Sequence, residues 1–248
     1  MNSHGWTIAV LRARAKVILI ASLQMSALVV FAGDSIEESI QLLHKRDQRA
    51  RAVEALVKAG PDALPKLLAA ADVRNGLAIN AILTQMGHPA IVKLVDLMRS
   101  GDQRITAADA LNRVITRAEF KQAPALIDCL TDAQIKHSCG QALVKVIGPE
   151  SRGRVLALLK ALKDKDPDVR MYACLALGQV GPKAASAVPE LSLALKDEAA
   201  AVRRSAAGAL GKMGPAAKPA VPALKAAAED SDGDMRRMAA EALKKIST

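Results

Sequence analysis

The sequence predicts an all-α protein, an α-solenoid built as a superhelix of stacked helical hairpins. Residues 164–248 repeat themselves without a gap every 33 residues, the interval from Asp164 to Asp197. Each full repeat carries two apolar stripes with helical spacing. Aromatic residues make up only 2% of the chain, so its interior must be built from Ala, Leu, Val and Ile. A fixed period between about 20 and 50 residues is the sequence signature of a solenoid.

The repeat is defined by columns of identical or similar residues one period apart. These columns include Asp164/Asp197/Asp230, Arg170/Arg203/Arg236, Ala173/Ala206/Ala239, Leu177/Leu210/Leu243, Gly181/Gly214 and Pro189/Pro222. In the first half of one unit, Val169, Ala173, Leu177 and Val180 are spaced 4, 4 and 3, which places them on one side of a helix. Gly181–Pro182 then ends that helix, because Gly suits a C-terminal cap and Pro cannot continue the hydrogen-bond ladder.

A second helix follows in each unit, with Val188, Leu191 and Leu195 on one face. The unit is therefore a hairpin of two short helices, too small to bury its own apolar face. It must stack on its neighbours, and the Ala columns allow the close approach that such stacking needs.

The run Asp166–Gly178, followed by Gly181–Pro182 and Ala187–Leu191, resembles the short HEAT-like repeat that was first grouped with the phycobilisome lyases. The signatures of ankyrin and tetratricopeptide repeats are missing. The resemblance is closest over 164–248, extends back to Asp132 and weakens upstream. It implies a superhelix whose second helices line the concave side.

Residues 1–32 have the features of a signal peptide. Arg12, Arg14 and Lys16 precede the apolar segment 17–32, and Val30–Ala32 offers small residues for cleavage after Ala32. We expect an exported protein, periplasmic or secreted. The alternative is an N-terminal anchor, if residues 17–32 are not cleaved.

Residues 33–248 are expected to form one solenoid domain of about six hairpins plus a terminal half-repeat. A first helix over 34–45, capped by Asp34 or Ser35, precedes hairpins at 47–71 and 72–100. The unit at 101–131 turns through Thr116–Gln122, and its register is not determined by the pattern. From Asp132 onward the period is regular, with Gly148–Pro149 in register with the helix-ending pairs Gly181–Pro182 and Gly214–Pro215.

No pattern of catalytic or metal-ligating residues stands out, and we predict a non-enzymatic protein without cofactor or metal. No phosphate loop, nucleophile elbow or zinc-binding helix motif occurs. The cysteines are Cys129, Cys139 and Cys174, and a Cys129–Cys139 disulfide is conceivable, so the redox state stays open. The Asp and Arg columns recur at the structural period. We interpret the aspartates as helix caps and the arginines as a ladder of hydrogen bonds between units.

The positive charge is concentrated in the C-terminal half. Residues 33–130 hold 13 basic and 12 acidic side chains, whereas 131–248 hold 19 basic and 13 acidic ones. Candidate partner-binding residues are the lysines on or near the second helices: Lys160, Lys163, Lys196 and Lys225. A solvated polar face that keeps the rod soluble is the simpler interpretation of the same lysines.

The leading hypothesis is a scaffold or adaptor that binds another protein or peptide along the concave face of the solenoid. One alternative follows from the resemblance, namely a factor that attaches a bilin to a protein Cys, as the phycobilisome lyases do. Another is a binder of an anionic polymer through the basic half. Nucleic acid is a poor candidate because Phe120 and Tyr172 are the only aromatics in the segment 33–248. Contact with a membrane is expected only if the N-terminal segment is retained.

Overall fold

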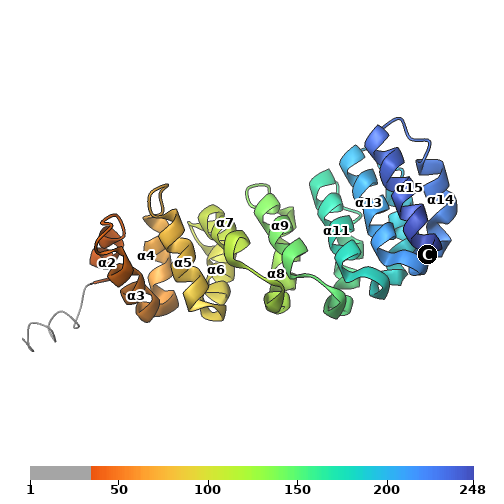
Figure 1. Cartoon of the computed structure of the whole chain (residues 1–248). Helices are drawn as coiled ribbons and strands as arrows, with labels where there is room; N and C mark the ends of the chain where they lie inside the picture. Colours follow the sequence, from red (N-terminus) through yellow and green to blue (C-terminus); the bar gives the residue numbers. More distant parts are fainter. Residues whose placement is uncertain (1–34) are drawn as a thin grey trace, which may run out of the picture.

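The computed structural model describes residues 35–248, which form a continuous, curved array of helices (Figure 1). A first helix α2 (Ile36–Leu42) begins the array. The first helices of the hairpins are α3 (Arg49–Ala59), α5 (Gly76–Met86), α7 (Arg104–Val114), α9 (Lys136–Val146), α11 (Pro167–Val180) and α13 (Ala200–Met213). Their second helices are α4 (Leu64–Ala69), α6 (His88–Ser100), α8 (Ala123–Asp128), α10 (Val155–Ala161), α12 (Val188–Ala194) and α14 (Val221–Ala227). The chain ends in α15 (Gly233–Ser247).

The expected count of hairpins is confirmed over these residues, with α2 before the first hairpin and α15 as the terminal half-repeat. The predicted cap of α2 is Ser35, whose hydroxyl accepts from the Glu38 backbone N–H while Glu38 accepts from the Ser35 N–H. Asp34, the other cap considered, lies outside the described residues. The predicted stripes are core: Leu177, its equivalent Leu210, and Leu191 are fully buried.

Glycine ends most first helices, as the Gly–Pro pairs of the repeat predict. Gly60, Gly87, Gly181 and Gly214 all have positive φ, between 58° and 74°, which L side chains rarely adopt. Gly148 differs, since it is extended (φ −163°) and Ile147 caps α9 instead. The sequence also did not reveal the short 3₁₀ turns, such as Gly181–Ala187, that lead from a first helix into its second helix.

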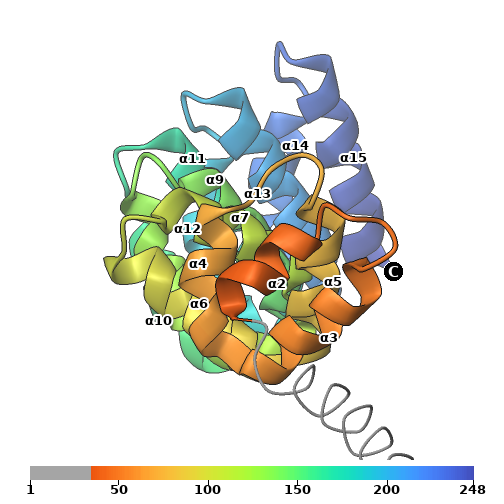
Figure 2. The same ribbon diagram turned by 90° about the vertical axis from the view of Figure 1, so that its left-hand side faces the viewer.

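First helices of successive repeats pack much more closely than second helices do. α11 packs directly on α13, and α13 on α15, whereas α12 and α14 have no comparable contact. A Cβ placed on Gly178 would lie 2.9 Å from the Cα of Ala209, so α11 and α13 nearly touch through their backbones. An array curves toward its more closely spaced layer, so the first helices line the concave side. The expectation that the second helices line it is therefore wrong. Figure 2 looks along the array from the end that holds α2.

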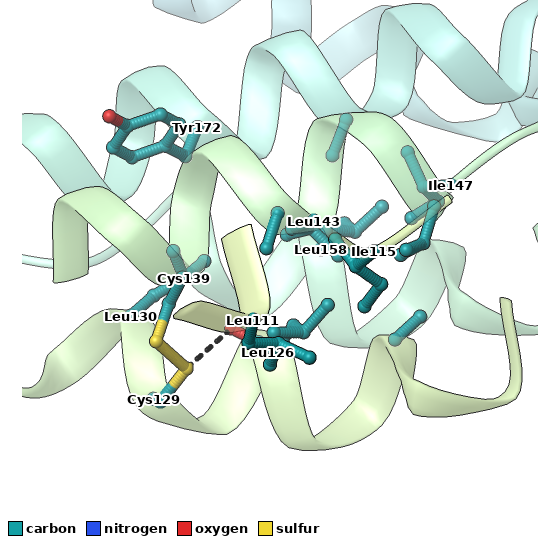
Figure 3. Close-up of a cluster of buried hydrophobic side chains, with 14 of the residues drawn as sticks. Leu111, Ile115, Leu126, Cys129, Leu130, Cys139, Leu143, Ile147, Leu158 and Tyr172 are labelled. Atoms are coloured by element: carbon teal, nitrogen blue, oxygen red, sulfur yellow. Dashed lines mark hydrogen bonds between the residues drawn. A yellow bond between two sulfur atoms is a disulfide. The ribbon is translucent and has the colours of Figure 1, made fainter. Parts of the chain in front are cut away.

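A disulfide joins Cys129, at the end of α8, to Cys139 in the middle of α9, with the two Cα atoms 6.2 Å apart. Figure 3 shows it at the edge of the cluster formed by Leu111, Leu126 and Leu143. The bond therefore links the second helix of one hairpin to the first helix of the next. It settles the pairing that the sequence left open.

The proposed signal peptide or anchor, residues 1–32, lies outside the described part of the chain. Within residues 35–248, no helix has both the length and the apolar character needed to cross a bilayer.

Candidate partner-binding face

The arginine column joins successive repeats, as the sequence predicts. Arg170 of α11 donates from Nε and Nη2 to the two carboxylate oxygens of Asp197 in the next unit, at 2.7 and 2.8 Å. Its Nη1 also donates to two carbonyls of its own loop, those of Asp164 and Lys165. Arg203 repeats the arrangement one period later with Asp230, at 2.9 and 3.2 Å. We call each such pair an arginine clamp.

The aspartate column has a different local role from the one predicted. Asp164, Asp197 and Asp230 each accept the backbone N–H two residues later, which shapes the loop before the helix. The side-chain caps of α11 and α15 are instead Asp166 and Asp232. The aspartates of this column therefore stabilise the loops before the helices, and Asp197 and Asp230 also accept hydrogen bonds from the clamp arginines. They do not cap helices.

The clamp keeps the Asp197 carboxylate ionised. Burial disfavours the charge, but hydrogen bonds from Arg170 and from the Ala199 N–H outweigh it, so the pKa of Asp197 is lowered from 3.8. The pKa of Asp230 is also lowered, mainly by its backbone hydrogen bond and then by Arg203.

The clamp extends upstream to a repeat whose register the sequence left open. Arg104 pairs with Asp132 and donates from Nε to the Met98 carbonyl, six residues back. Arg170 makes the equivalent hydrogen bond to the Asp164 carbonyl from Nη1. The sequence does carry a signal, because Arg104 lies two repeat periods before Arg170. Irregular units between them hide it, and the intervening position is His137.

The concave face holds an apolar hollow of about 320 Å³ between α11, α13 and α15. Met171 and Leu175 of α11 and Met238 of α15 form its walls, and Gly208 of α13 lies between them. Arg204 and Lys212 also line it, whereas no carboxylate does. The sequence did not reveal these residues, because they differ from one repeat to the next and so escape a search for periodicity.

The four predicted lysines lie elsewhere. Lys160, Lys163, Lys196 and Lys225 are all exposed, in or just after the second helices α10, α12 and α14. Lys196 lines a shallow polar recess near Asp197 and Ser231. Because the first helices form the concave side, the structure does not bring these lysines into the hollow.

The described residues hold one free thiol, and it is buried. Cys174 is fully buried, and burial raises the pKa of its thiol to about 12, which makes it a poor nucleophile. Across residues 35–248, no group of three or more His, Cys, Asp and Glu side chains could hold a metal ion.

Comparison with known proteins places this arrangement among repeat proteins. Residues 155–247 match the family of HEAT repeats. No curated protein matches the sequence. An engineered protein is similar in structure with a TM-score of 0.56 and 22% identity, covering 87% of this chain and 97% of its own. A designed armadillo repeat protein in complex with the peptide (KR)4 has a TM-score of 0.54 at 19% identity, covering 86% of this chain and all of its own.

At 22% and 19% identity, these structural likenesses bear on the fold alone. They agree with an array of stacked helical hairpins. The chain is an α-solenoid similar in fold to armadillo and HEAT-like repeat proteins, and its residues 155–247 match the family of HEAT repeats.

Proposed function

We propose that this chain is a non-enzymatic scaffold that binds another protein or peptide along the concave face formed by its first helices. The observation that carries the proposal is the hollow between α11, α13 and α15, whose apolar walls face solvent on the inner side. Solenoids present such extended concave surfaces to their partners. The designed armadillo protein in complex with (KR)4 is a structural neighbour that holds a peptide.

Site-specific photo-crosslinking in the native cells tests the proposal. A photoreactive residue replaces Gln141 of α9, which is exposed on the first-helix side, and in a matched variant replaces Leu193 of α12, which is 74% exposed on the opposite side. Protein adducts from position 141 and none from position 193 support the proposal. Adducts from position 193 alone, or from neither position, contradict it.

Export is part of the proposal and rests on two features. Residues 1–32 have the sequence pattern of a signal peptide. The Cys129–Cys139 disulfide is of a kind that persists in oxidising compartments and is rare in the cytosol. N-terminal sequencing of the native protein should begin at Gly33, whereas a chain retaining residues 17–32 in the membrane fraction would show an anchor.

An anionic polymer is a second candidate partner, favoured by the exposed lysines Lys160, Lys163, Lys196 and Lys225 on the second-helix side. Binding through such lysines falls steeply with salt. Replacing all four by Gln should abolish that binding while leaving crosslinks from position 141 unchanged. Salt-insensitive binding would exclude the polymer.

A further inference from the structure

A row of cationic and amide side chains runs along the concave face, near the C-terminal end of each first helix. The residues two positions before the C-caps of α3, α5, α7, α9, α11 and α13 are Lys58, Gln85, Arg113, Lys145, Gln179 and Lys212. Lys245, one period after Lys212, continues the row on α15. Not one of these positions is acidic.

Four side chains of this row share an orientation, since each of them reaches over the preceding first helix. Arg113 of α7 donates from Nε to the Asn80 side chain of α5 at 3.0 Å, and Lys145 of α9 donates to the Asn112 carbonyl of α7. The Cδ of Lys212 lies 3.4 Å from where a Cβ of Gly178 would be, and the Cδ of Lys245 lies 3.7 Å from that of Gly211. The cations therefore lie side by side across the inner surface.

Three acidic residues on α15 and at its N-cap already have partners. Asp232 accepts from Arg204 at 2.7 Å, and Asp234 and Glu241 both accept from Arg237. Within the described residues, Lys212 and Lys245 form no ion pair. One turn before Lys212 lies Gly208, at the floor of the hollow, so this cation borders apolar surface.

We infer that the partner segment is an acidic peptide with aliphatic side chains, which pairs its carboxylates with Lys145, Lys212 and Lys245. Its aliphatic side chains enter the hollow lined by Met171, Leu175 and Met238. This inference rests on the proposed function and adds the chemistry of the partner. Charge complementarity selects an acidic segment, because Lys212 lines the hollow without an ion pair and no carboxylate of the described residues lines it.

The spacing of the repeats suggests a sequence pattern for that peptide. Packed helices lie about 8–10 Å apart, and an extended chain advances roughly 3.3 Å per residue. Carboxylates about three residues apart can therefore meet cations on successive repeats. A probe of repeated Glu-Ser-Leu triplets meets both requirements.

The experiment measures binding of fluorescent triplet peptides to the full chain by anisotropy. Glu-Ser-Leu should bind at least tenfold more tightly than Glu-Ser-Ser, which lacks the aliphatic side chain, and than Lys-Ser-Leu, which reverses the charge. Equal binding of Glu-Ser-Ser or of polyphosphate would make the face a general anion binder and overturn the inference. Tighter binding of Lys-Ser-Leu, or no binding of any peptide, would overturn it as well.

Variants locate the binding site. Lys212→Glu should weaken Glu-Ser-Leu binding at least tenfold, while Lys218→Glu, the same charge change at an exposed position of the turn 214–220, should stay within twofold of the parent protein. Lys212→Gln keeps the fold testable, because Gln179 occupies the same position in α11. If Lys212→Glu and Lys218→Glu weaken Glu-Ser-Leu binding equally, the peptide does not bind at the proposed site. If crosslinks form from position 141 but no acidic peptide binds, the scaffold proposal stands and this inference fails.

Discussion

Arg170 and Asp197 form a two-pronged ion pair between successive repeats, with N–O distances of 2.7 and 2.8 Å. The same arginine closes its own loop through the carbonyls of Asp164 and Lys165. One side chain thus fixes both the shape of a loop and the distance to the next hairpin. Bidentate geometry of this kind suits Arg and not Lys.

Arg170→Ala should lower the free energy of unfolding by about 3 kcal/mol, because it leaves a largely buried carboxylate without its partner. Arg236 is the matched control. It binds the carbonyls of Asp230 and Ser231 in the same way but has no following repeat to clamp. Arg236→Ala should cost less than about 1 kcal/mol. Equal costs in urea unfolding would show that the clamp does not couple the repeats.

The clamp also predicts a pH dependence of stability. The pKa of Asp197 is lowered in the folded protein, so its contribution is present above the carboxyl pKa of the unfolded chain, about 3.9. That contribution is lost as the pH falls through the lowered folded-state pKa. The difference in melting temperature between the parent protein and Asp197→Asn should therefore be largest near neutral pH and shrink below about pH 4. The control Glu229→Gln, at an exposed position, should show a small and constant difference. A difference in melting temperature between the parent protein and Asp197→Asn that grows on acidification would contradict this role.

Close packing of the first helices can be tested with two glycines on that layer. Gly178→Ala should destabilise by about 1–3 kcal/mol, since its Cβ would meet the Ala209 backbone at 2.9 Å. Gly208→Ala meets only the flexible end of Met238, at 3.1 Å, so the gain in helix propensity, up to about 1 kcal/mol, should dominate. If both substitutions stabilise the protein, α11 and α13 are not in backbone contact.

The predicted core stripe gives a further prediction. Leu177→Ala should cost about 2–5 kcal/mol, because a fully buried leucine leaves a cavity between repeats. Leu193→Ala, at a 74% exposed position of α12, should change stability by less than about 0.5 kcal/mol. Thermal or urea unfolding measures the free energy of unfolding of both variants. A loss of stability at Leu177 as small as that at Leu193 would show that Leu177 is not part of the core.

Thiol counting tests the disulfide. The folded protein should show no reactive thiol, because Cys129 and Cys139 are bonded and Cys174 is buried. Denaturation without reductant should expose one thiol, that of Cys174. The Cys129→Ser, Cys139→Ser double variant should lose about 2–3 kcal/mol of stability, as expected for closing a loop of this length. Three thiols on denaturation would show that the bond is absent.

Much of the fold could be predicted because the repeat makes the same physical demands three times. The spacing of the apolar residues predicts buried stripes, which include Val169, Leu177 and Leu191. The pair Gly181–Pro182 indicates where a helix must end. The 3₁₀ turns could not be predicted, since the same Ala-rich segments suit a helix or a turn. The concave side could not be derived either, because curvature depends on how closely Gly178 and Ala209 approach.

The sequence did not reveal the apolar hollow, and the four lysines it singled out lie outside that hollow. The choice of Lys160, Lys163, Lys196 and Lys225 assumed that the second helices face inward. The hollow depends on Met171, Leu175 and Met238, which stand at unlike positions of their repeats and so leave no periodic trace. The row through Lys145 and Lys212 is periodic, but it resembles the ordinary preference for cations at helix C-termini.

The central claim is that partners bind the face formed by the first helices. The most direct measurement is an NMR titration of the protein, labelled at its methionine methyl groups, with the partner captured by crosslinking at position 141. Resonances of Met171 and Met238 should shift on binding, while that of Met98, buried in α6 at 0% exposure, should stay in place. A saturated complex in which neither Met171 nor Met238 shifts would contradict the claim.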